Sequence, residues 1–167
     1  VTEQSGLFTT QPLGASSWGS VEVNDVGQVG YRAGFGNGQA FSSRGADLTQ
    51  ALHAFDAALD PISPYSFLFS CTFNNNRQIA SVVRFGAAGQ TGNSQPDQIR
   101  IFNADGSSIL IAQDRDSNIT SPYSGFDSTR VGLTDDGRVS FVATLFGGGR
   151  GVFLSDGTTT ITIANTN

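Results

Sequence analysis

The segment from Thr129 to Ala164 constrains the fold of this chain more than any other, because it consists of four short apolar runs. Asp-Asp-Gly, Gly-Gly-Gly and Ser-Asp-Gly separate these runs. Between Val139 and Leu145, every second residue is Val, Phe, Ala or Leu, and this period of two is typical of a half-buried strand. Glycine supplies the positive φ angles that tight hairpins need. The segment therefore predicts a four-stranded antiparallel meander.

The same layout occurs twice upstream, in residues 21–35 and 72–85. Aligned on their turns, the three segments share four inward positions, of which only Ser81 departs from the apolar pattern: Val29, Ile79 and Val139; Tyr31, Ser81 and Phe141; Ala33, Val83 and Ala143; Phe35, Phe85 and Leu145. Connectors recur as well, as Ser5-Gly6-Leu7, Ser63-Pro64-Tyr65 and Ser121-Pro122-Tyr123. We predict one domain, residues 1–167, of three repeats at about 5–62, 63–120 and 121–167.

The predicted fold is all-β: three four-stranded antiparallel repeats arranged as propeller-like blades, with a β-trefoil or a β-prism as alternatives. The chain has 21 Gly and 13 Phe in 167 residues, which favours strands and turns. Residues 46–58 also have helical spacing at Leu48, Leu52 and Phe55, but the repeat register predicts a strand over 52–55. Trp18 is expected to pack under the first repeat.

His53 and Cys71 are the only histidine and the only cysteine, so a His-dependent triad or a zinc site has almost no residues to draw on. No G-x-S-x-G turn is present. We interpret His53 as a surface or edge-strand residue and Cys71 as a small buried hydrophobe. These residues predict no enzymatic activity.

Residues 114–118 offer the best candidate for a metal site. Asp114, Asp116 and Asn118 place three oxygen ligands at alternate positions, as calcium loops do at their start. The later ligands of an EF-hand are missing, so a polar connector with Asx turns is the simpler interpretation. Asn118-Ile119-Thr120 is also a sequon for N-glycosylation at Asn118. Calcium is the only cofactor that the sequence suggests.

Acidic and amide residues recur at the first turn of each repeat, as Asp25, Asn74-Asn75-Asn76 and Asp135-Asp136. Paired carboxylates hydrolyse glycosides in some enzymes. Asn and Asp also tolerate the left-handed conformations of tight turns, which explains these positions more simply. We therefore assign the recurring residues a structural role.

Residues 24–31 (Asn-Asp-Val-Gly-Gln-Val-Gly-Tyr) and 134–141 (Thr-Asp-Asp-Gly-Arg-Val-Ser-Phe) resemble the NxxGxxxF tandem repeat of secreted bacterial proteins. Residues 151–164 are similar to the second half of that repeat. The resemblance covers nearly the whole chain and is loosest in the second unit, where Asn76-Arg77 replaces the usual Gly. It implies propeller-like blades on an exported protein and carries no catalytic residues.

These observations predict a secreted structural protein, extracellular or at the cell surface, that assembles with other copies of itself. Three blades are too few to close a propeller. We therefore expect another copy to cover the outer faces of the end sheets, either in a closed dimer of about six blades or in an open polymer. Val1–Thr10 and Thr158–Ala164 are the candidate strands for pairing between copies. The alternative is a carbohydrate-binding module that uses Tyr65 and Tyr123.

Other partners and locations are disfavoured by charge and hydropathy. The net charge is −5 and the arginines are scattered, which argues against nucleic acid. No apolar run reaches the length of a membrane span. The chain contains no Met, and Val1 suits the end that signal-peptide removal leaves.

Overall fold

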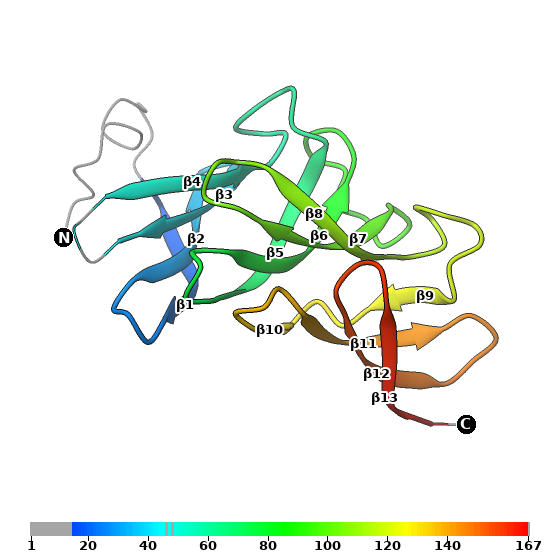
Figure 1. Cartoon of the computed structure of the whole chain (residues 1–167). Coiled ribbons are helices and arrows are strands. Elements are labelled where there is room, and N and C mark those ends of the chain that lie inside the picture. Colours follow the sequence, from blue (N-terminus) through cyan, green and yellow to red (C-terminus); the bar gives the residue numbers. More distant parts are fainter. Residues whose placement is uncertain (1–14, 46, 48, 167) are drawn as a thin grey trace.

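The computed structural model describes residues 15–45, 47 and 49–166, and within these it shows thirteen strands and no helix (Figure 1). The strands are β1 (Ser17–Val23), β2 (Val29–Phe35), β3 (Gly38–Arg44), β4 (Gln50–Phe55), β5 (Tyr65–Phe73), β6 (Ile79–Phe85), β7 (Asp97–Phe102), β8 (Ser108–Gln113), β9 (Tyr123–Phe126), β10 (Gly132–Leu133), β11 (Val139–Leu145), β12 (Arg150–Ser155) and β13 (Thr160–Asn165). With no helix in this part of the chain, none is present that could span a membrane.

The strands form three separate antiparallel sheets, one for each predicted repeat. Sheet A has the order β1-β2-β3-β4, sheet B the order β5-β6-β7-β8, and sheet C the order β10-β11-β12-β13 with β9 also on β11. The all-β class is confirmed, and β4 shows that residues 50–55 are a strand and not a helix. None of the three sheets closes into a barrel, which a β-trefoil would require.

Sheet C differs from the predicted four strands because its first strand is split in two. β9 pairs with the end of β11 and β10 with its beginning, so the two short strands share one place in the sheet. The first strands of the other sheets are irregular at the same point, between Gly19 and Glu22 and between Leu68 and Cys71. The five residues between β9 and β10 thus enlarge an irregularity that all three sheets have.

The fourth strands share a second irregularity, a bulge of one residue. The register shifts after the pairs Phe41–Ala54, Ile99–Ala112 and Val152–Ala164, which leaves one extra residue on the edge strand each time. That extra residue is His53 in sheet A, Ile111 in sheet B and Ile163 in sheet C. The three sheets therefore correspond residue by residue, and positions in one can be compared with those in another.

The sheets follow one another in chain order, with sheet B between A and C (Figure 1). We call the face that carries Ile79 and Val83 in sheet B, and its equivalents, the leading face. The opposite face, which carries Val82 and Ile99 in sheet B, is the trailing face. Phe41 of the trailing face of sheet A packs with the leading face of sheet B in one buried cluster: Phe41, Leu68, Cys71, Phe73, Ile79, Val83 and Phe102.

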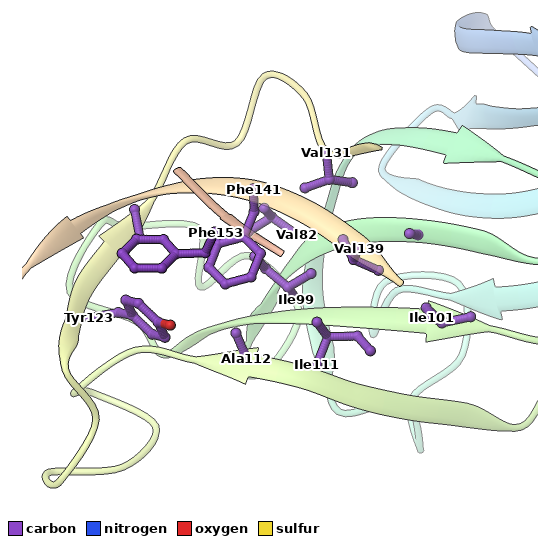
Figure 2. Packing of buried hydrophobic residues seen from close by; sticks show 12 residues of the cluster. Val82, Ile99, Ile101, Ile111, Ala112, Tyr123, Val131, Val139, Phe141 and Phe153 are labelled. Carbon is purple, nitrogen blue, oxygen red and sulfur yellow. The ribbon is translucent and has the colours of Figure 1, made fainter. Parts of the chain in front are cut away.

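The second interface joins the trailing face of sheet B to the leading face of sheet C. Figure 2 shows Val82, Ile99 and Ile111 from sheet B facing the rings of Tyr123, Phe141 and Phe153. Tyr123 meets both Phe141 and Phe153 edge-on. Burial of these apolar surfaces holds the stack together, at about 25 cal/mol per Å² removed from water.

Candidate functional site at the ends of the stack

A ladder of hydrogen bonds joins the first turns of the three sheets. The Asn24 amide donates to the Asn74 carbonyl at 3.0 Å, and the Asn74 amide donates to the Thr134 carbonyl at 3.0 Å. The next residues repeat this pattern: the Asp25 N–H donates to the Asn75 side chain, and the Asn75 N–H donates to the Asp135 carboxylate. The ladder fixes the register between sheets, since each turn is bonded to the next.

The ladder brings two carboxylates to either side of one amide. The Asn75 Nδ2 donates to Asp135 Oδ2 at 2.8 Å and lies 3.4 Å from Asp25 Oδ2. The side chains that the sequence placed on hairpin turns therefore do meet, from repeats that are far apart in the chain. Asn75 separates the two carboxylates and is bonded to both, which agrees with a structural role.

The trailing face of sheet C carries the apolar pattern of sheet B but is partly open to solvent, with Val142 and Leu154 half-buried and Val152, Ile163 and Ala164 exposed. Its residues Val142, Val152, Leu154, Ile163 and Ala164 take the places of Val82, Ile99, Ile101, Ile111 and Ala112. Val152 is 38% exposed and Ile163 is 59% exposed, whereas Ile99 is 0% and Ile111 5% exposed. Sheet C therefore exposes a surface whose equivalent on sheet B is buried.

A shallow groove of about 420 Å³ lies on this face. Val142, Val152 and Ala164 line it, and Asp127 and Arg150 lie at the same groove, 3.4 Å apart as an ion pair. No serine, histidine or cysteine lines it. A groove with an apolar floor suits an apolar partner surface better than a polar small molecule.

Strand β13, at the edge of the same sheet, is open to pairing. All six residues of Thr160–Asn165 are exposed, and Ile161 is 53% exposed. The strand has no charged residue and no proline, the features that usually protect an edge from other strands. The predicted pairing segment 158–164 therefore includes an exposed edge strand, while Val1–Thr10 lies outside the described residues.

At the other end of the stack, Trp18 departs from its expected place. Instead of packing under the first repeat, it is 53% exposed, with one edge-on contact to Tyr31 at 5.5 Å. Val21 and Val23 on the same strand are 59% and 67% exposed. The sequence could not show this, because the exposure of β1 depends on which other segments pack against it in the folded structure.

The candidate calcium residues lie in the connector between β8 and β9. Asp114 is buried, and its carboxylate accepts hydrogen bonds from the N–H groups of Asp97 and Ser117. Asp116 is exposed, and the Asn118 Oδ1 accepts from Thr120. Within the described residues no group of three His, Cys, Asp or Glu side chains is placed to hold a metal. The calcium site and the glycosylation of Asn118 stay predictions.

The equivalent connector of sheet A explains the role of Asp114. Asp56 is also buried and accepts from the N–H groups of Gln39, Ala58 and Leu59. Burial raises the pKa of both carboxyls, Asp56 and Asp114. The two aspartates therefore close the start of each connector with the same hydrogen bonds, although the first connector lacks the calcium-like spacing.

His53 and Cys71 are both buried in the packed interior. His53 lies on an edge strand, as expected, but is 2% exposed and not at the surface; its ring nitrogens lie 2.8 Å from Ser43 Oγ and 3.2 Å from the Phe102 carbonyl. Burial lowers its pKa to about 4. Cys71 is buried as predicted, and burial raises the pKa of its thiol to about 12. A buried histidine with so low a pKa is a weak base, and a buried protonated thiol is a weak nucleophile, so neither favours nucleophilic catalysis.

Among the described residues, the fold is a stack of three antiparallel sheets with exposed apolar residues on β1 and on the trailing face of sheet C. Searches against protein-family models, curated proteins and solved structures find no match for this chain.

Proposed function

We propose that the chain is a structural protein that assembles with further copies of itself through sheet C and catalyses no reaction. The observation that carries the proposal is the exposed trailing face of sheet C, whose equivalent in sheet B is buried. Soluble monomers rarely leave a contiguous apolar surface of this kind open to water. Cover from another copy would remove Val152, Ile161 and Ile163 from solvent.

The absence of a reaction is supported by what the described residues do. The imidazole of His53 and the thiol of Cys71 point into interfaces between sheets. The paired carboxylates Asp25 and Asp135 are bridged by the Asn75 amide in a turn ladder. These four side chains therefore each have a structural partner.

The location outside the cell and the propeller-like arrangement are the finer parts of the proposal. They are supported by the resemblance of residues 24–31 and 134–141 to the NxxGxxxF repeat and by the face-to-face order of the sheets. Two or more copies would then continue the series of sheets, either as a closed ring or as an extracellular filament.

The carbohydrate-binding alternative loses its main support in the structure. The Tyr123 ring is 7% exposed and packs among Phe126, Phe141 and Phe153. Tyr65 is half-buried and meets Phe85 and Phe102 edge-on. Rings that lie within the sheet interfaces are not available to stack on sugars, so no observation favours this function.

The proposal is tested by the mass of the protein in solution. Sedimentation and light scattering over a wide range of concentration, with electron microscopy of concentrated samples, are expected to show dimers, larger rings or filaments. Val152→Arg, which places a charge on the exposed face, is expected to shift the mass to the monomer. A wild-type protein that stays monomeric at every concentration would contradict the proposal.

A further inference from the structure

The first strands of sheets A and B, and residues 126–133 of sheet C, each carry three apolar residues in matching positions. These triads are Trp18, Val21 and Val23 in β1; Leu68, Cys71 and Phe73 in β5; and Phe126, Val131 and Leu133 in sheet C. The register gives the match: Trp18, Leu68 and Phe126 pair with Ala33, Val83 and Ala143, and Val23, Phe73 and Leu133 pair with Val29, Ile79 and Val139. Val21, Cys71 and Val131 each lie two residues before the last member.

Two of the three triads pack on the trailing face of the preceding sheet. Leu68, Cys71 and Phe73 are 0%, 6% and 8% exposed and share a buried cluster with Phe41 of sheet A. Val131 is 4% exposed, and Phe126 and Leu133 pack on the cluster that includes Val82 and Ile99 of sheet B. Within the described residues no sheet precedes the β1 triad, and its members are 53%, 59% and 67% exposed.

The contact between β5 and sheet A is close and specific. A Cβ atom at Gly30 would collide with the Phe73 ring, and the Arg32 guanidinium donates to the Leu68 carbonyl at 2.9 Å. The Gln39 side chain accepts from the Leu68 N–H at 2.9 Å. A triad on a trailing face is therefore how this chain joins one sheet to the next.

From these two unmatched surfaces we infer that the trailing face of sheet C binds the β1 triad of a second copy, head to tail. The inference rests on the proposed self-assembly and names the surface of the partner. It follows because the chain makes this joint twice internally, between A and B and between B and C, and its described residues end in an exposed trailing face on sheet C and an exposed triad on β1. The leading face of sheet A is itself buried, with Ala33 0% and Phe35 3% exposed, so the β1 triad is the part of sheet A that would make the contact. The two halves lie on opposite ends of the stack (Figure 1), so one molecule does not join them to each other.

A symmetric contact between two trailing faces fits the structure less well. In both internal joints a trailing face meets a leading face and its triad, and no two trailing faces meet. Such a contact would also leave the β1 triad exposed at both ends of the dimer. Head-to-tail contacts give a ring if the rotation closes and a filament if it does not.

The turn ladder predicts a weaker joint between copies than within one. Thr134 takes the place of Asn24 and Asn74, so the ladder has no amide there to donate to the next turn. Asp135 would face Asp25 of the next copy, two carboxylates where the internal joints pair an Asp with Asn75. Like charges at a contact oppose association, and the sheets of one chain are thereby kept tighter than the copies.

The decisive experiment uses one variant for each end. Val21→Arg blocks the β1 triad and Val152→Arg blocks sheet C, and both positions are exposed, so each variant is expected to keep the wild-type unfolding midpoint at low concentration. Each alone is expected to be a monomer, and an equal mixture is expected to form a one-to-one dimer and nothing larger, by sedimentation and native mass spectrometry. Ile62→Arg, on a connector and 91% exposed, is the control that leaves assembly unchanged.

Other outcomes separate the inference from the proposed function. If wild type assembles but Val21→Arg alone still dimerises, the joint is symmetric through sheet C or β13, and the inference fails while the proposed function stands. If Val152→Arg alone assembles as wild type does, sheet C is not used and both fail. If the wild-type protein is always a monomer, both the proposed function and the inference fail.

A gain of association provides a second test. Asp25→Asn gives the first turn the residue that Asn75 has, which removes the facing pair of carboxylates and lets the new amide donate to Asp135 of the preceding copy, as the Asn75 amide donates to Asp25 of the preceding sheet. We expect the joint to tighten roughly tenfold, which is about 1.4 kcal/mol. An unchanged or weaker association of this variant would overturn the head-to-tail register.

Discussion

Sheets B and C have the same apolar pattern on their trailing faces, and they differ in what covers it. Ile99 of sheet B is 0% exposed under sheet C, whereas Val152, its equivalent, is 38% exposed. The first strands show the reverse at the other end, since Cys71 is 6% and Val21 59% exposed. A repeat chain thus places similar residues in covered and open environments, and the proposed assembly is argued from the open ones.

The largest expected difference between the two sheets is in the free energy of unfolding. Ile99→Ala removes buried methyl groups and leaves a cavity, and we expect it to destabilise the protein by about 2–5 kcal/mol. Val152→Ala removes groups that are partly exposed to water, since Val152 is 38% exposed, and should cost the monomer less than about 1 kcal/mol. Urea unfolding of both variants at low concentration measures this. Equal losses would mean that sheet C is covered in the monomer.

His53 distinguishes sheet A from the others, because Ile111 and Ile163 take its place in sheets B and C. Burial lowers the pKa of His53 from 6.5 to about 4, so the unfolded chain binds its proton first as pH falls. This contribution to stability is complete above about pH 6.5 and is lost as pH falls towards about 4, about 3 kcal/mol in all.

His53→Ile should remove this loss, measured as the difference between the urea midpoints of variant and wild type across that pH range. The raised pKa values of the buried carboxyls of Asp56 and Asp114 make stability increase as pH falls, which is the opposite direction, and this contribution is common to both proteins. A difference that does not change with pH would show that His53 is not buried.

The turn ladder gives a smaller contrast between its middle and its first member. Asn74 is 4% exposed, donates to Thr134 and Gln78, and accepts from the N–H groups of Asn76 and Gln78. We expect Asn74→Ala to cost about 2–3 kcal/mol, because buried main-chain groups lose their partners, and Asn24→Ala about 1 kcal/mol. Thermal unfolding of both variants tests the order, and a greater loss at Asn24 would reverse it.

The smallest effect is expected at the connector with the calcium-like spacing. Both oxygens of Asp114 accept main-chain hydrogen bonds, as those of Asp56 do in the connector that lacks this spacing. We expect calcium to change the unfolding midpoint by no more than the error of the measurement, and Asp116→Ala to cost less than about 0.5 kcal/mol. A midpoint that rises with calcium and falls back in Asp116→Ala would establish the metal site.

The sequence alone determined the local structure and the number of repeats. Alternation in residues 139–145 and glycine at the turns predict strands and hairpins, because period two and positive φ are properties of a few adjacent residues. The inward positions of the repeats and the burial of Cys71 followed from the same pattern. The recurring Asp and Asn residues were correctly placed on turns, although their ladder from sheet to sheet was not visible.

Only the tertiary structure decided which of the matching surfaces are covered. Burial depends on the neighbouring sheet and not on the residue itself, so Ile99 and Val152 look alike in sequence and differ in exposure. For the same reason Trp18 lies half in water and His53 lies buried. The split of the first strand of sheet C was also decided there, because pairing with β11 joins two segments that the sequence shows as one interrupted run.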